Sequence, residues 1–202
     1  FAQDFLHVEN GELVAVAARD QQRAEEFAHR YQIKRSYGCY DDLVQDPNVD
    51  IIYITTPHHL HFEHTMLCFK NNKPVVCEKP ITINTKQLLQ LKQEAKLRNL
   101  FLMEAIWTYF LPPVLHAKDW VQNNKIGEIK NIKATMGFAP PYNEQHRLFN
   151  KELAGGSLLD IGFYACAITT HFIQSPIKSI QSSADFTNSG VDLTTHFKLE
   201  FE

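Results

Sequence analysis

The chain has 202 residues, of which 44% are hydrophobic and 21% charged, and its formal net charge is −3. These values are ordinary for a core-forming protein and allow one large domain or two small ones. The slight acidic excess argues against nucleic acid or an anionic membrane surface as the main partner, and no apolar run reaches the ~18 residues of a membrane-spanning helix.

The N-terminal half alternates apolar runs with helical patterns, after a short amphipathic start at Phe1. The helical patterns cover 20–32 and 58–70, then 84–98, and a short helix with a turn is expected within 40–50. The apolar runs are short and rich in β-branched residues, as buried strands are, and they lie at 13–18, 51–55, 73–78 and 100–104. This alternation predicts a parallel sheet built from βαβ units.

The pattern changes after Pro112 and Pro113. A helix is expected at 114–124 and an apolar helix at 158–173. Period-2 alternation predicts antiparallel strands at 128–138, 177–186 and 194–201. We therefore expect a dinucleotide-binding domain of α/β type over 1–105 and an α+β substrate and dimerisation domain over 106–202.

Polar or aromatic residues follow each apolar strand of the first half. They are Arg19-Asp20, the run 55–58, the run 78–80 and the run 104–107. Ligands of open parallel sheets bind beyond the carboxyl ends of the strands, so these four tips predict a binding crevice rather than ordinary loops.

Arg19 occupies the position that meets the adenosine ribose of a dinucleotide, and Arg23 lies one helical turn further on. Two guanidinium groups suit a 2′-phosphate; the alternative is a solvated helix start in which Arg23 pairs with Asp20 or Glu26. The G-x-G-x-x-G fingerprint is absent. Either the chain is a fragment cut at both ends, lacking the first strand and its glycine loop, or the fold imitates the dinucleotide-binding class.

Three residues are candidates for the chemistry. Lys79 ends a strand in "CEKP", where its ammonium group could stabilise a developing alkoxide or share a proton with it. Asp160 and Tyr164 lie four residues apart on one face of an apolar helix. The alternatives are a surface lysine in a turn and a buried hydrogen-bonded pair that serves only the core.

The histidines and cysteines point away from a metal site. His58, His61 and His64 are spaced three apart, but no acidic or cysteine ligand accompanies them, so we predict no metal. The cysteines (Cys39, Cys68, Cys77 and Cys166) are scattered, which favours buried reduced thiols. The start "FAQDFLHVEN" lacks the features of a signal peptide, and we expect a cytoplasmic protein.

The ordered set "AVAARD", "TTPHHLH", "CEKP" and "GGSLLDIGFY" resembles the Gfo/Idh/MocA family of oxidoreductases. Together with "FLMEAIWT", it is most similar to the dihydrodiol dehydrogenase branch of that family. The resemblance implies a Rossmann domain followed by an α+β domain whose open antiparallel sheet forms a homodimer or a higher homo-oligomer. Here Tyr109 replaces an arginine typical of the branch, and Met136 replaces an aromatic pocket residue.

The same resemblance implies an enzyme that transfers a hydride between a secondary alcohol of a sugar or cyclic diol and NADP, with NAD as a possible cofactor. Lys79, Tyr164 and Asp160 are then the catalytic residues. The alternatives are a non-catalytic NAD(P)-binding regulator and a hydrolase or lyase that retains NAD. The expected cofactor contacts are Arg19, Arg23, Thr56, Pro57, His58, His61, Glu78, Lys79, Pro80 and Trp107.

Overall fold

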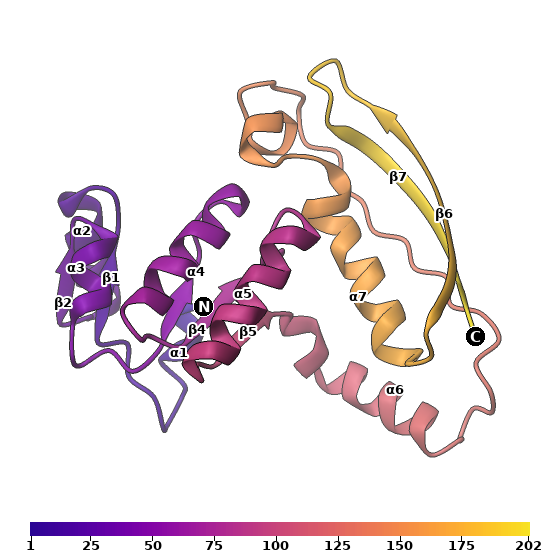
Figure 1. The fold of residues 1–202 in the computed structure, drawn as a ribbon, viewed down its shortest axis with the longest axis horizontal. Helices are drawn as coiled ribbons and strands as arrows, with labels where there is room; N and C mark the ends of the chain where they lie inside the picture. The colour runs from indigo at the N-terminus through magenta and orange to yellow at the C-terminus, as the bar shows by residue number, and fades with distance from the viewer. The chain divides into compact units, whose positions relative to one another are not determined.

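The computed structural model describes residues 1–202 (Figure 1). Its elements run in the order α1 (Ala2–Phe5), β1 (Ala15–Ala17), α2 (Gln21–Tyr31), β2 (Arg35–Tyr37), α3 (Tyr40–Gln45), β3 (Ile52–Ile54), α4 (His61–Lys70), β4 (Val75–Glu78), α5 (Thr85–Arg98), β5 (Leu102–Ala105), α6 (Pro112–Gln122), α7 (Phe163–Phe172), β6 (Ile177–Phe186) and β7 (Asp192–Phe201). Short 3-10 and π-helical turns lie between them and are introduced below.

Two compact units divide the chain. The first comprises 1–55, 60–77 and 86–103, and the second comprises 56–59, 78–85 and 104–202. Two short segments that follow strands β3 and β4 therefore belong with the C-terminal half, so the units interleave along the sequence.

The first unit has the expected alternation of strands and helices. Strand β1 pairs in parallel with β2, and β3 pairs in parallel with β4, which also neighbours β5. These are two sheets, with orders β1–β2 and β3–β4–β5, where we expected one. The two orders correspond to the parts 3-2 and 4-5-6 of the doubly wound order 3-2-1-4-5-6, in agreement with the expected fold.

Local sequence explains the helix starts and the core of this unit. The Asp20 carboxylate accepts a hydrogen bond from the Arg23 backbone N–H at 2.9 Å and caps α2. Ala24 and Ala28 of α2 are buried as expected, whereas Phe27 of the same predicted face is exposed. Further along, Phe69, Val75 and Leu91 from three successive elements are completely buried and form the centre of the core.

Strand β2 was not predicted. Arg35, Ser36 and Tyr37 are polar and half-buried, and three residues are too few to show a period. A residue beyond the strand, Asp46, stabilises it through side-chain contacts. Its carboxylate accepts a hydrogen bond from the Tyr37 hydroxyl at 3.0 Å and forms an ion pair with Arg35 Nε at 3.0 Å.

The second unit contains α6, α7 and a long antiparallel hairpin of β6 and β7 (Figure 1). The predicted helices and these two strands are confirmed, with β7 starting at Asp192 rather than at residue 194. The predicted strand over 128–138 is wrong, because this segment belongs to no helix or strand and is mostly exposed. A strand needs a neighbour for its backbone hydrogen bonds, and β6 and β7 pair with each other instead.

The cysteines form no disulfide. Cys68 and Cys77 are buried, and burial raises the pKa of the Cys68 thiol to about 12, which leaves it protonated and unreactive. Cys39 is exposed, so the expectation of buried thiols is wrong at that position.

One helical run, Lys151–Phe172, is long and apolar enough to cross a membrane by length and composition alone. The core helices of soluble proteins pass the same test. The run contains Asp160 and its ion pairs, which would be costly in lipid, so we interpret it as the helix of the candidate site described next.

Candidate active site

The candidate site lies within the second unit, which includes the segments after β3 and β4 as well as the end of β5. Three of the four predicted strand tips therefore contribute to one compact body. The fourth tip, Arg19-Asp20, belongs to the first unit.

Lys79 is largely buried, with 13% of its side chain exposed. Its Nζ donates a hydrogen bond to the backbone carbonyl oxygen of Asp160 and lies 3.6 Å from the carboxylate oxygen Oδ1 of the same residue. The ammonium group also lies 4.9 Å from the centre of the Tyr164 ring. The three predicted catalytic residues thus meet in the structure, although they come from positions some 80 residues apart in sequence.

The segment that carries Lys79 is held on both sides. The Lys79 backbone N–H donates to Glu78 Oε2 at 3.2 Å, and the Ile81 N–H donates to Glu104 Oε1 at 2.7 Å. The Lys79–Pro80 peptide bond is cis. Burial raises the pKa of the Glu104 carboxyl above its ordinary value, an effect that the hydrogen bond from Ile81 partly offsets.

Asp160 lies in a π-helical turn, η5 (Leu158–Gly162), and is buried. Such turns are rare and often occur at functional sites. Three nitrogens surround Asp160 Oδ1: Arg147 Nη1 at 3.1 Å, Lys79 Nζ at 3.6 Å and His58 Nε2 at 3.9 Å. One buried carboxylate therefore faces the basic side chains of Arg147 and Lys79 as well as a histidine.

Tyr164 follows one turn later, at the start of α7. Its hydroxyl oxygen accepts a hydrogen bond from Trp107 Nε1 at 3.0 Å, and the two rings meet edge to face with centroids 6.3 Å apart. Trp107 belongs to a 3-10 turn after β5, η2 (Trp107–Phe110), and is 56% exposed. The indole therefore holds the phenol while offering a free face to a ligand.

Gly155 and Gly156 make a close approach to the backbone of a neighbouring turn. A Cβ atom at Gly155 would lie 2.6 Å from the Arg147 carbonyl oxygen, and Gly156 has a φ of +117°. Only glycine fits there without displacing the turn that carries Arg147, η3 (Arg147–Phe149).

Asp192, the first residue of β7, caps the helix that follows these glycines. Its Oδ2 accepts from Ser157 Oγ at 2.8 Å and from the Leu158 backbone N–H at 2.6 Å. The hairpin and the turn that carries Asp160 are thus directly connected.

The predicted cofactor contacts fall into two groups. Thr56, Pro57, His58, Glu78, Pro80 and Trp107 all lie in the second unit with Lys79. Arg19 and Arg23 are exposed in the first unit and take part in no ion pair, so the alternative pairing of Arg23 with Asp20 or Glu26 is not formed.

His61, the remaining predicted cofactor contact, lies in the first unit at the start of α4 and is completely buried. Its contact with a cofactor stays a prediction. No group of three or more His, Cys, Asp or Glu side chains is arranged to hold a metal ion, and this includes His58, His61 and His64.

Sequence reasoning missed Arg147 and the proximity of His58 to Asp160. Arg147 lies 13 residues before Asp160, outside any helical period, and reaches it only because the chain turns back at the two glycines. The glycine pair was the available signal, but it does not say which upstream side chain is brought near.

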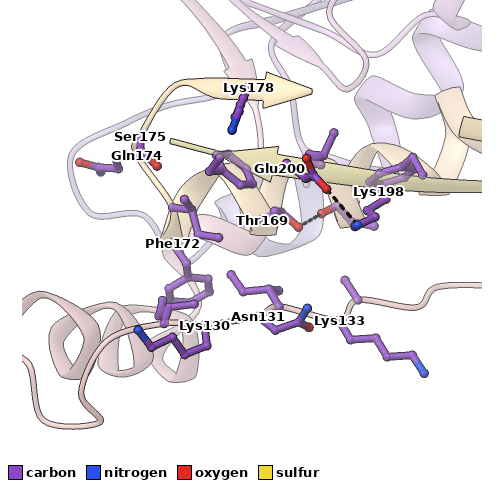
Figure 2. Close-up of a pocket in the computed structure, with 18 of the residues that line it drawn as sticks. Lys130, Asn131, Lys133, Thr169, Phe172, Gln174, Ser175, Lys178, Lys198 and Glu200 are labelled. Atoms are coloured by element: carbon purple, nitrogen blue, oxygen red, sulfur yellow. Dashed lines mark hydrogen bonds and ion pairs between the residues drawn. The ribbon is translucent and has the colours of Figure 1, made fainter. Parts of the chain in front are cut away.

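A hollow of the second unit lies apart from these residues. It has a volume of about 1320 Å³ and lies among the segment 127–136, α7 and β7. Figure 2 shows its charged lining, which includes Lys130, Lys133, Lys178 and the ion pair of Lys198 with Glu200. None of Lys79, Asp160 and Tyr164 lines it, and we base the candidate active site on those residues instead.

The parallel βαβ order is typical of dinucleotide-binding folds. Residues 1–106 match the family model described as "Oxidoreductase family, NAD-binding Rossmann fold". Residues 114–202 match the GFO/IDH/MocA C-terminal domain. The chain therefore belongs to the Gfo/Idh/MocA oxidoreductase family.

Relatives and solved structures agree with this assignment. The chain is 37% identical over 191 residues to the trans-1,2-dihydrobenzene-1,2-diol dehydrogenase of Xenopus laevis, covering 94% of this chain and 57% of that protein. It is 40% identical over 175 residues to the D-xylose 1-dehydrogenase (NADP(+)) of Hypocrea jecorina, covering 81% of this chain and 44% of the relative. The crystal structure of an NAD binding oxidoreductase from Klebsiella pneumoniae matches with a TM-score of 0.81 and 25% identity, covering 100% of this chain and 58% of that one.

The chain thus spans about half the length of the curated relatives that it matches, from 44% to 58% of those reported.

Proposed function

We propose that the protein is a dehydrogenase that transfers a hydride between a secondary alcohol carbon, on a sugar or a cyclic diol, and NADP. The observation that carries this proposal is the meeting of Lys79, Asp160 and Tyr164 in one compact unit. The named relatives, which act on a dihydrodiol and on xylose, support the substrate class.

Two parts of the chain suit the two ends of a nicotinamide dinucleotide. Exposed Arg19 and Arg23, which form no ion pair, suit a 2′-phosphate, and the open face of Trp107 beside Tyr164 suits the nicotinamide ring. When bound, the nicotinamide accepts the hydride at its C4 atom.

The residues of the chain handle the proton. During alcohol oxidation the hydroxyl O–H bond breaks, and in this proposal its proton passes to the oxygen of Tyr164 in its phenolate form, which becomes the neutral phenol. The Trp107 N–H donates a hydrogen bond to that oxygen and Lys79 Nζ lies 4.9 Å from the ring centre, so both groups stabilise the negative charge of the phenolate. The alternative order, with Lys79 as the base, uses the same cluster.

The test uses the full-length protein with Lys79→Met and Tyr164→Phe. Both variants keep nearly the same volume, and we expect kcat to fall by about 10²-fold or more, as for loss of a general acid or base. The measurement is NADPH formation with a panel of sugars and cyclic diols, with circular dichroism to verify folding.

A near-normal kcat in both variants would refute the assigned roles. Wild-type protein that binds NADP but turns over no substrate would favour a cofactor-binding regulator. A cofactor that remains bound with no net reduction would favour a hydrolase or lyase.

We further propose a cytoplasmic homodimer, or a higher homo-oligomer, formed through the C-terminal sheet. Ile180, Phe186 and Leu193 support this, because each is more than half exposed on the hairpin. The absence of disulfides fits a reducing compartment. Sedimentation equilibrium of the full-length protein tests the oligomeric state, and a monomer at micromolar concentration would contradict the proposal.

A further inference from the structure

Arg147 makes the closest side-chain contact to the buried carboxylate of Asp160. Its Nη1 donates a hydrogen bond to Asp160 Oδ1 at 3.1 Å, whereas Lys79 directs its hydrogen bond to the Asp160 backbone carbonyl oxygen and stays 3.6 Å from Oδ1. The carboxylate is therefore occupied by the arginine, and the lysine is held beside it without a direct hydrogen bond to its charge.

The two basic side chains beside Asp160, Arg147 and Lys79, also differ in how much of each is exposed to solvent. Half of the Arg147 side chain is exposed, whereas only 10% of the Asp160 side chain and 13% of the Lys79 side chain are. A half-exposed guanidinium group loses little hydration on pairing, so Arg147 can neutralise the buried carboxylate at small cost.

We propose that Arg147 is a positioning residue for the reaction: its hydrogen bond to Asp160 Oδ1 takes up part of the charge of that carboxylate, so that the Lys79 ammonium pairs with it only weakly and stays over the Tyr164 ring. The role of Arg147 in a reaction rests on the proposed function. Its effect on the Lys79 proton does not, and that effect can be measured without turnover. A carboxylate that shares its charge with an arginine stabilises a neighbouring ammonium less than an unshared carboxylate does.

Removing Arg147 should therefore let Asp160 pair fully with Lys79. The ammonium group would keep its proton to higher pH and would be drawn away from Tyr164. Several titratable or charged groups face this cluster from the elements around it: His58 from the segment 56–59, Glu78 beside Lys79, Glu104 through the Ile81 N–H, and Tyr164 from α7. Arg147→Met leaves all of these groups in place.

The primary experiment measures the proton on Lys79 directly and needs no turnover. Full-length wild-type, Arg147→Met and Arg147→Lys proteins are labelled with trace acetic anhydride across a pH series, and acetylation of Lys79 is followed by mass spectrometry. We expect the midpoint of the labelling profile in Arg147→Met to move to higher pH by roughly 1 unit. Arg147→Lys should restore most of the wild-type profile, because it keeps a charge at this position.

Arg98→Met is the matched control. Arg98 forms an ion pair with Glu94 at 3.1 Å on α5, in the other unit, and its loss should leave the Lys79 profile unchanged. A wild-type profile in Arg147→Met, or an equal shift in Arg98→Met, overturns the proposal. So does an Arg147→Lys profile that matches Arg147→Met, because the effect would then not depend on charge.

Steady-state kinetics separate this inference from the proposed function. If wild-type protein oxidises a diol or sugar, the acidic limb of the kcat/KM profile in Arg147→Met should shift upward with the labelling profile, and kcat should fall about 10-fold. A labelling shift with no wild-type turnover would uphold the role of Arg147 and refute the dehydrogenase assignment. If Arg147→Met does not fold, Arg147→Lys and Arg147→Gln serve as the charged and neutral pair.

Discussion

Glu104 connects the end of β5 to the segment that carries Lys79. Its Oε1 accepts the Ile81 N–H at 2.7 Å, and its carboxyl is half-buried. The side chain therefore joins two of the three strand tips that build the candidate site. Burying the ionised Glu104 carboxylate destabilises the fold, and the size of this effect depends on pH because the carboxyl can take up a proton.

We expect Glu104→Gln to change how stability depends on pH. Burial raises the pKa of Glu104 above the ordinary value of 4.5, so the protonated carboxyl favours folding, and this stability is lost as the pH rises through the higher folded pKa. Glutamine keeps the acceptor for Ile81 without the charge. The variant should melt at about the same temperature as wild type near pH 4 and about 2–4 °C higher at neutral pH.

The measurement is a series of thermal melts between pH 4 and pH 8. Glu94→Gln is the control, because Glu94 forms a surface ion pair with Arg98 and should show no such gain. A constant difference between wild type and Glu104→Gln at every pH would show that the Glu104 charge has no energetic cost.

Among the elements, α4 contributes most directly to the core of the first unit. Phe69 is completely buried, whereas Phe27, on α2 of the same unit, is 39% exposed. The two phenylalanines therefore offer a matched comparison of the same substitution in two environments.

Phe69→Ala should lower the free energy of unfolding by about 3–5 kcal/mol, because it removes buried surface and leaves a cavity. Phe27→Ala should lower it by clearly less, since the ring already contacts water. Urea denaturation of both variants measures the difference. Equal losses would mean that α4 does not form part of the cooperative core.

The helices and strands that periodicity and local chemistry determine can be predicted from the sequence. The helices and the hairpin strands 177–186 and 194–201 agree with the structure. The segment 128–138 does not, because an alternating pattern describes the faces of a strand but not the neighbour that it requires. Strand β2 was missed for the opposite reason, since its contacts with Asp46 stabilise residues that show no pattern of their own.

The same distinction between local pattern and contacts made by the fold applies to the candidate site. Lys79, Asp160 and Tyr164 could be chosen from the sequence, because charged and phenolic groups in apolar surroundings are unusual. Arg147 could not, because its contact depends on a turn of the backbone at Gly155 and Gly156. Burial is likewise not evident from the sequence at His61, whose place in "TTPHHLH" gives no sign that the fold buries it completely.

For the whole molecule, we expect cofactor choice and chemistry to be separable. Arg19 and Arg23 lie in the first unit and Lys79 with Tyr164 in the second. Arg19→Ala in the full-length protein should weaken NADP binding about 10- to 100-fold, the range for loss of a hydrogen bond to a charged group. NAD binding and the folded structure should be nearly unchanged.

Isothermal titration of both cofactors measures these affinities. Arg30→Ala, at an exposed position in the last turn of α2, is the control. Equal losses for NADP and NAD in Arg19→Ala would refute the 2′-phosphate role and would leave the cofactor preference to other residues.

The cap at Asp192 has a consequence for communication within the second unit. This one carboxylate accepts from Ser157, from the Leu158 N–H and from Thr195 of its own strand at 2.8 Å, so β7 and the turn that carries Asp160 share a single fastening point. A shift of β7 at Asp192 would therefore also displace the turn that carries Asp160. If two copies associate through this hairpin, as we propose, ligand binding at one site would alter the other site by this route, and Asp192 would couple the two subunits.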